Sequence, residues 1–136
     1  MKPTNEIAWS DFEKVVLCSG TVIDVKEFPE ARKHAYIITV DFGESIGIKK
    51  SSAQITDLYS KEELLNKQII GVVNFPPKQI GPIKSEFLIT GLIQDDGSVV
   101  LAVPDKAVAN GLRLGWFINR FDELRQKTIC QSLDLF

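Results

Sequence analysis

The sequence has little of the chemistry that most enzymes and metalloproteins need. It contains one histidine and two cysteines in 136 residues. Cys18 and Cys130 belong to no CxxC or His/Cys cluster, so a structural metal site is not expected. No glycine-rich phosphate loop occurs, and Ser51, His34 and Asp41 lack the spacing of a nucleophile elbow. These absences predict a protein with no catalytic activity, no cofactor and no metal.

Long apolar runs and a large net charge are also missing. No run approaches the length of a membrane span, and the N-terminus lacks the apolar core of a signal peptide, which predicts a cytoplasmic protein. The net charge of −2 argues against a protein that coats nucleic acid through its overall field, although it leaves room for a local basic face. The composition, 44% hydrophobic and 25% charged, is that of one ordinary globular domain.

What the chain does have is a series of short strand patterns rich in β-branched and aromatic residues. They cover residues 15–28, 35–43, 46–54, 68–73, 87–93 and 99–103. Gly20, inside the first pattern, is expected to mark a bulge or bend of the kind that closes a small barrel. The order of these segments, with one helix between the third and fourth strands, predicts a mainly β, five-stranded oligonucleotide/oligosaccharide-binding (OB) barrel.

Two S-x-x-E capping boxes predict short helices. Ser10–Glu13 is expected to begin a helical turn near the N-terminus. Ser60–Glu63 is expected to begin the inserted helix, which would run to about Asn66 and bury Leu64 and Leu65.

The C-terminal part differs from the strand series. Phe117, Phe121 and Leu124 recur at helical spacing, which indicates an amphipathic helix. The expected organisation is therefore an N-terminal extension with a helical turn, an OB domain and a C-terminal amphipathic tail, over residues 1–14, 15–115 and 116–136.

The segment 74–86, which joins two strand patterns, is the most distinctive stretch of the chain. It contains three prolines and one glycine. Because proline fixes φ and has no N–H, this backbone is expected to form a well-defined exposed loop and neither a helix nor a central strand. A stiff loop that is set on a sheet and rich in hydrogen-bonding groups indicates a binding site.

Several strings between roughly residues 10 and 115 have a familiar form. They are Phe28-Pro-Glu-Ala-Arg-Lys33, Asp41-Phe-Gly43 with Ile46-Gly-Ile-Lys49, Ser51-Ser-Ala-Gln-Ile-Thr56, Asn74-Phe-Pro-Pro-Lys78 with Lys84-Ser-Glu86, and Val103-Pro-Asp105 with Asn110-Gly111. Together they resemble the CsaA family of protein-secretion chaperones, part of the wider tRNA-binding-domain family that is also appended to methionyl- and phenylalanyl-tRNA synthetases. The resemblance implies an OB barrel, a homodimer, tRNA binding and chaperone activity toward exported proteins.

The resemblance also implies an RNA-facing surface, in which lysines track phosphates and polar side chains read base edges or ribose hydroxyls. The alternative is that the lysines serve solubility and the polar groups bond to the local backbone. Phe75 is expected to pack against its neighbours rather than stack on a base. The candidate tRNA-binding residues are Lys49, Lys50, Ser51, Ser52, Gln54, Asn74, Lys78, Lys84, Ser85 and Glu86.

One departure from the family pattern favours a second hypothesis. The family's first strand usually reads Asp-Ile-Arg-x-Gly, whereas this chain has Val16 and Cys18 in place of the acid and the arginine. Without that guanidinium, the chain would be a chaperone that binds unfolded or exported polypeptides and has little RNA affinity. Apolar residues such as Trp116, Phe117 and Phe121 would then carry the binding, or the tail would recruit a partner to a dimeric interaction module.

Overall fold

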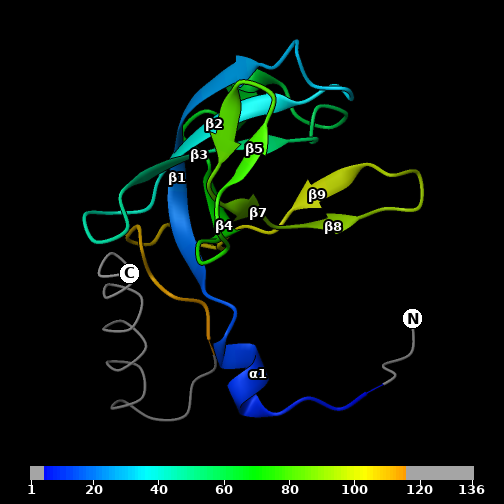
Figure 1. Ribbon diagram of the computed structural model, residues 1–136. Helices are drawn as coiled ribbons and strands as arrows, with labels where there is room; N and C mark the ends of the chain where they lie inside the picture. The colour runs from blue at the N-terminus through cyan, green and yellow to red at the C-terminus, as the bar shows by residue number, and fades with distance from the viewer. Residues whose placement is uncertain (1–4, 116–136) are drawn as a thin grey trace.

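The computed structural model describes residues 5–115, so the expected tail over 116–136 lies outside the described residues. The central unit is a five-stranded antiparallel sheet in the order β3-β2-β1-β4-β7, curved into a nearly closed barrel (Figure 1). Its strands are β1 (Leu17–Glu27), β2 (Tyr36–Asp41), β3 (Ile48–Ala53), β4 (Gln68–Val72) and β7 (Leu88–Ile89). The predicted mainly β, OB-like barrel is confirmed.

Strand β1 is long because it serves two neighbours. Its first half pairs with β4 and its second half pairs with β2. The ladder to β2 shifts register between Val22 and Asp24, which places the β-bulge there and not at Gly20 as expected. Gly20 instead lets the strand cross the core closely, since a Cβ there would lie 2.5 Å from Val40 Cγ1 and 2.7 Å from a ring carbon of Phe42.

The core fills the interior of this barrel. Phe42 is fully buried, and its ring meets that of Phe87 edge to face with 5.1 Å between centroids. Hydrogen bonds link Tyr36, Tyr59 and Leu101. The Tyr36 hydroxyl donates to the carbonyl of Tyr59, and the Tyr59 hydroxyl accepts from Leu101 N–H. Burial, followed by the nearby Glu27 carboxylate, raises the pKa of the Tyr36 phenol.

The segment after the barrel strands returns along β1. Ser19 N–H donates to the carbonyl of Leu112, and its hydroxyl donates to the carbonyl of Ala109 at 2.7 Å. Asn110 Oδ1 accepts from the Thr21 hydroxyl at 2.8 Å. These bonds fix the 104–115 segment onto the first strand.

The helices follow the capping boxes only in part. In α2 (Lys61–Leu64), Ser60 Oγ accepts from Glu63 N–H and Glu63 accepts from Ser60 N–H, so this capping box is confirmed. The helix stops at Leu64, where Asn66 turns to a positive φ of 69°. The expected extension to Asn66 is therefore wrong, and so is the burial of Leu65, which is 46% exposed.

Helix α1 (Trp9–Glu13) begins before the box that predicted it. Its N-cap is Ala8, whose N–H donates to the Asp11 carboxylate at 2.9 Å. Ser10 is already inside the helix, so the predicted cap at Ser10 is wrong.

These two serines provide a matched stability test. Ser60→Ala removes a real N-cap and is expected to lower the free energy of unfolding by about 1 kcal/mol. Ser10→Ala, in the same sequence motif, is expected to change it by less than about 0.5 kcal/mol. Urea unfolding midpoints measure both, and equal losses in the two variants would contradict the assignment of the caps.

Two hairpins extend from the barrel. Strands β5 (Lys78–Ile80) and β6 (Ile83–Ser85) form the first within the expected 74–86 loop. The segment therefore carries more regular structure than expected, while its three prolines stay outside the strands, as their missing N–H groups require. Gly81, in the turn at φ +56°, sits against the ring of Phe28.

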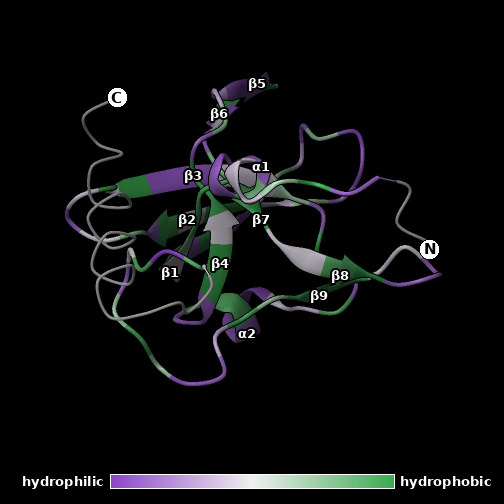
Figure 2. Cartoon of the chain, turned by 90° about the horizontal axis from the view of Figure 1, so that it is seen from below, coloured by the Kyte–Doolittle hydropathy of each residue, from purple (hydrophilic) through white to green (hydrophobic). Residues whose placement is uncertain are grey.

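The second hairpin pairs β8 (Gly91–Ile93) with β9 (Val99–Leu101), and we call it the arm. It forms because the expected 87–93 strand splits at Thr90, whose N–H and hydroxyl both donate to Ile70 O. In its turn, Asp96 accepts from the hydroxyl and N–H of Ser98, and these bonds hold the pKa of Asp96 below its usual range. Figure 2 shows hydrophobic colour along β4 and the arm and hydrophilic colour over most of β3. No helix among the described residues is long and apolar enough to cross a membrane.

Candidate functional site

A cavity of about 710 Å³ lies between the β5–β6 hairpin, β3 and the start of β7. Most of its wall is apolar, with polar groups from β3 and from the hairpin, which is the usual make-up of a ligand site. The lining residues are Ser51, Ser52, Phe75, Pro76, Pro77, Lys78, Gln79, Ile80, Ser85, Glu86, Phe87 and Leu88. The 74–86 segment therefore forms one wall of this cavity, and its role as a binding site stays a prediction.

A chain of hydroxyl groups holds the hairpin to β3. Ser85 Oγ accepts from Ser52 N–H at 3.3 Å and lies 2.9 Å from Ser51 Oγ, which donates to Phe87 O at 2.8 Å. If the Ser85 hydroxyl donates to Ser51 Oγ, the hydroxyl groups of both serines have hydrogen-bond partners. Ser51 is only 2% exposed, so its hydroxyl supports the cavity from within and is not presented to a ligand.

Glu86 fastens the same edge. Its N–H donates to Lys50 O at 2.8 Å, and its Oε1 accepts from Lys50 N–H at 3.1 Å. Backbone and side chain together thus continue the ladder from β3 to the end of the hairpin, which brings Ser85 and Glu86 beside Ser51 and Ser52 as the sequence predicts.

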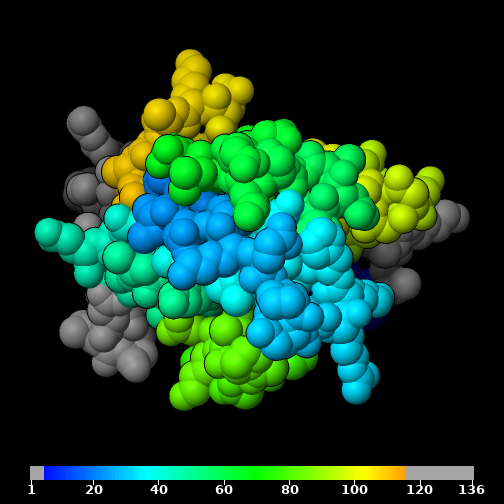
Figure 3. Space-filling view, turned by 90° about the horizontal axis from the view of Figure 1, so that it is seen from above, coloured from blue at the N-terminus to red at the C-terminus, as the bar shows by residue number. Residues whose placement is uncertain are grey.

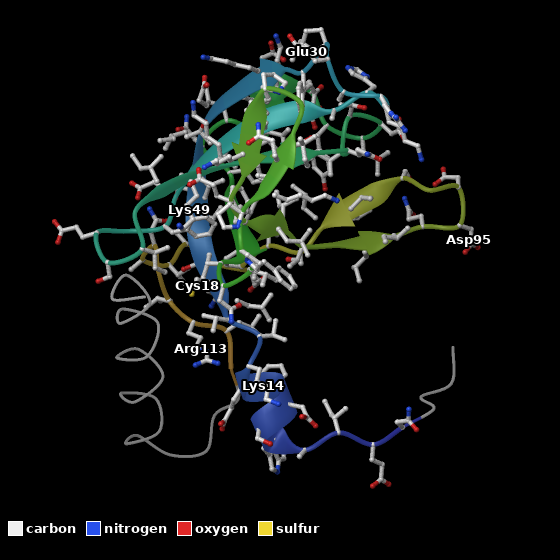
Figure 4. The ribbon with its side chains drawn as sticks, viewed as in Figure 1. Lys14, Cys18, Glu30, Lys49, Asp95 and Arg113 are labelled. Carbon is white, nitrogen blue, oxygen red and sulfur yellow. The ribbon has the colours of Figure 1, made fainter. Side chains whose placement is uncertain are left out.

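Strand alternation divides the candidate residues of β3 between two faces. Successive side chains point to opposite sides of a strand. Ser51 and Ala53 are buried, whereas Lys50 and Ser52 are more exposed and alternate with them. The run Lys49–Ser52 is therefore not one continuous ligand-facing surface, and Lys49 is only partly exposed (Figure 4).

Three exposed lysines lie on the hairpin and on the neighbouring strand β3. Lys78 pairs with Ser85 and lines the cavity, and Lys84 pairs with Gln79, which also lines it. Lys50 is exposed on β3. Among residues 5–115, none of the three makes an ion pair, so their charges are available to an anionic ligand.

Asn74 has a structural partner on each side of its amide. Its Oδ1 accepts from Val16 N–H at 3.0 Å, and its Nδ2 donates to Lys14 O at 2.7 Å. It does not line the cavity, and neither does Gln54, which is exposed just beyond β3. Asn74 therefore pins the start of β1 to the end of β4.

Sequence reasoning missed several apolar and amide contributors to the cavity. Phe75, expected to pack against its neighbours, is 56% exposed at the cavity, and Leu88 is 53% exposed. Gln79 also lines it. The two prolines after Phe75 were the available signal, because they stiffen the chain that carries its ring.

The two residues that depart from the family's first-strand pattern lie away from the cavity. Val16 and Cys18 are both in the core, with exposures of 5% and 0%, and neither lines the cavity. Figure 4 shows Cys18 low on β1, on the side of the barrel toward Lys14. The presence of Cys18, where the family usually has arginine, therefore does not remove a group from the cavity wall.

Comparison with known proteins agrees with this geometry. Residues 17–113 match a family model described as a putative tRNA binding domain. The chain belongs to the tRNA-binding-domain family. The match spans the whole barrel, including the hairpin and the cavity.

Solved relatives of this family share both fold and sequence. The chain is similar to the chaperone CsaA of Bacillus anthracis, at 42% identity and a TM-score of 0.77, covering 82% of this chain and 100% of that one. It is similar to the CsaA chaperone protein of Picrophilus torridus, at 47% identity and a TM-score of 0.76, covering 81% and 100%. The resemblance to CsaA noted in the sequence is confirmed.

A curated relative in the family is much longer. Over 114 residues, the chain is 37% identical to the methionine–tRNA ligase of Pyrococcus horikoshii, which covers 83% of this chain and 15% of the ligase. The chain thus spans about a seventh of the length of that relative.

Proposed function

We propose that this protein binds tRNA in the cytoplasm, without catalysis, on the surface formed by the β5–β6 hairpin, the cavity and the outer side of β3. The observation that carries the proposal is the set of three exposed lysines, none of which pairs with an acidic side chain within residues 5–115, beside a cavity lined by both apolar and polar groups. Membership of the tRNA-binding-domain family supports it.

RNA binding needs two kinds of contact, to phosphates and to bases. Lysines neutralise phosphates and give affinity that falls with salt, but they carry no sequence information. Sequence-specific contacts to RNA need unstacked bases, which loops and ends of tRNA provide. A concave, partly apolar site beside exposed lysines offers both kinds of contact.

The direct test is Lys84→Glu. We expect weaker tRNA binding at every salt concentration and a salt slope reduced by about one, because one phosphate contact is lost. Fluorescence anisotropy across a salt titration measures both quantities. The matched control is Lys106→Glu, an equal charge change in the exposed 104–110 segment, which Figure 3 shows at the opposite edge from the light-green hairpin. If Lys84→Glu and Lys106→Glu behave alike, the lysine site is misplaced.

We also propose that the protein is a homodimer joined through the arm. Leu92 and Ile93 are 69% and 79% exposed, and Val100 is 37% exposed. Because Leu92 pairs with Val100 and Ile93 lies on the other face, both faces of the arm are apolar. An isolated two-stranded hairpin is marginally stable in water, so a covering surface is expected, and a second copy supplies one.

A second candidate is a chaperone that binds extended polypeptide, including exported proteins. The apolar cavity wall and the exposed arm favour it. Suppression of aggregation of a denatured client, with and without competing tRNA, separates the two functions. Suppression that tRNA abolishes would place both ligands on one surface, and no suppression would exclude the chaperone.

A further inference from the structure

One carboxylate oxygen in the cavity is left without a partner. Glu86 uses Oε1 to accept from Lys50 N–H, as described above. Its Oε2 has no hydrogen bond or ion pair to any residue between 5 and 115. Because Oε1 is fastened to β3, the carboxylate is held in place at the cavity wall and presents Oε2 as a fixed acceptor.

The neighbouring polar groups are also acceptors or can become so. Gln79 donates one N–H of Nε2 to Gly81 O at 2.8 Å, which leaves its carbonyl oxygen and its second N–H available. Ser52, with its hydroxyl at the cavity, can accept or donate. Lys78 lies on the cavity wall, whereas Lys50 and Lys84 are not among its lining residues. The wall thus carries the Glu86 carboxylate as a fixed acceptor beside groups that can accept or donate, and the two lysines outside it are placed for phosphates.

We propose that the cavity holds one unstacked base that presents N–H donors at its Watson–Crick edge, guanine before the others. This rests on the proposed RNA-binding function and adds a base preference to it. Guanine offers N1–H and the 2-amino group side by side, which suits a carboxylate, whereas uracil offers one N–H between two carbonyl oxygens. Phe75 and Leu88 supply the exposed apolar surface against which the base ring would pack.

The test uses the full chain and labelled single-stranded heptaribonucleotides of uridine with a central guanosine, inosine or uridine. Inosine keeps N1–H and lacks only the 2-amino group. Anisotropy is expected to show the guanosine oligomer binding about tenfold more tightly than the all-uridine oligomer, with inosine between them. Glu86→Gln is expected to remove most of this difference. Because it also removes one negative charge near the phosphates, the preference is taken as the ratio of the guanosine and all-uridine affinities within each variant.

Glu86→Gln is the informative substitution because the amide oxygen can still accept from Lys50 N–H and keep the hairpin attached. An unchanged urea midpoint verifies this, and Glu86→Asp, which keeps the charge and shortens the side chain, is expected to retain part of the preference if the midpoint also holds.

Equal binding of the three oligomers, or a guanosine preference that survives in Glu86→Gln, overturns the proposal. Salt-dependent tRNA binding that is sensitive to Lys84→Glu would then still support the proposed function.

Discussion

Ser51→Ala is expected to lower the free energy of unfolding by about 1–3 kcal/mol, because it leaves Phe87 O and the Ser85 hydroxyl with a lost partner in a buried site. It is also expected to weaken RNA binding, since the hydroxyl chain holds the hairpin that forms the cavity wall. Urea unfolding and tRNA anisotropy on the same preparation measure the two effects.

The neighbouring serine provides the control. The chain of bonds uses only backbone groups of Ser52, whose N–H donates to Ser85 Oγ and whose carbonyl accepts from Ser51 Oγ at 3.2 Å. The Ser52 hydroxyl makes no hydrogen bond to another residue between 5 and 115. Ser52→Ala is therefore expected to leave the unfolding midpoint unchanged, within about 0.5 kcal/mol. If Ser52→Ala destabilises the protein as much as Ser51→Ala does, the hydroxyl chain does not hold the hairpin.

Ile93→Asp is expected to dissociate the proposed dimer, since it puts a charge into the apolar contact that the arm would make. Light scattering coupled to size exclusion, over a range of protein concentrations, is expected to show a dimer for the unmodified chain and a monomer for this variant. Leu58→Asp, at another exposed leucine between β3 and α2, is the control and is expected to stay dimeric. A dimer that persists in Ile93→Asp would show that the arm is not the interface.

Much of the barrel could be predicted from the sequence because strand patterns are local. The alternation of side chains along β2 and β3 and the cap at Ser60 need no knowledge of distant residues. The bulge and the arm could not be predicted this way. The bulge depends on how β1 changes partner from β4 to β2, and the arm depends on Thr90 bonding back to Ile70.

The position of the cavity was predictable as a region but not in its details. The proline-rich segment and the lysines indicated the part of the barrel where the cavity lies. Composition alone could not separate Ser51, which is buried and bonded, from Ser52, which is more exposed. Asn74 looked like a ligand group because an amide gives no sign of its partner, and its partners, Lys14 and Val16, are about 60 residues away.

The most direct test of the central claim is to map the tRNA contact on the protein itself. Backbone amide signals of the isotopically labelled full chain, followed by NMR as tRNA is added, report the surface that the RNA touches. We expect the largest changes at Lys50, Ser52, Lys78, Lys84 and Glu86, around the cavity. Changes confined to the arm or to α1, with the hairpin and β3 unaffected, would contradict it.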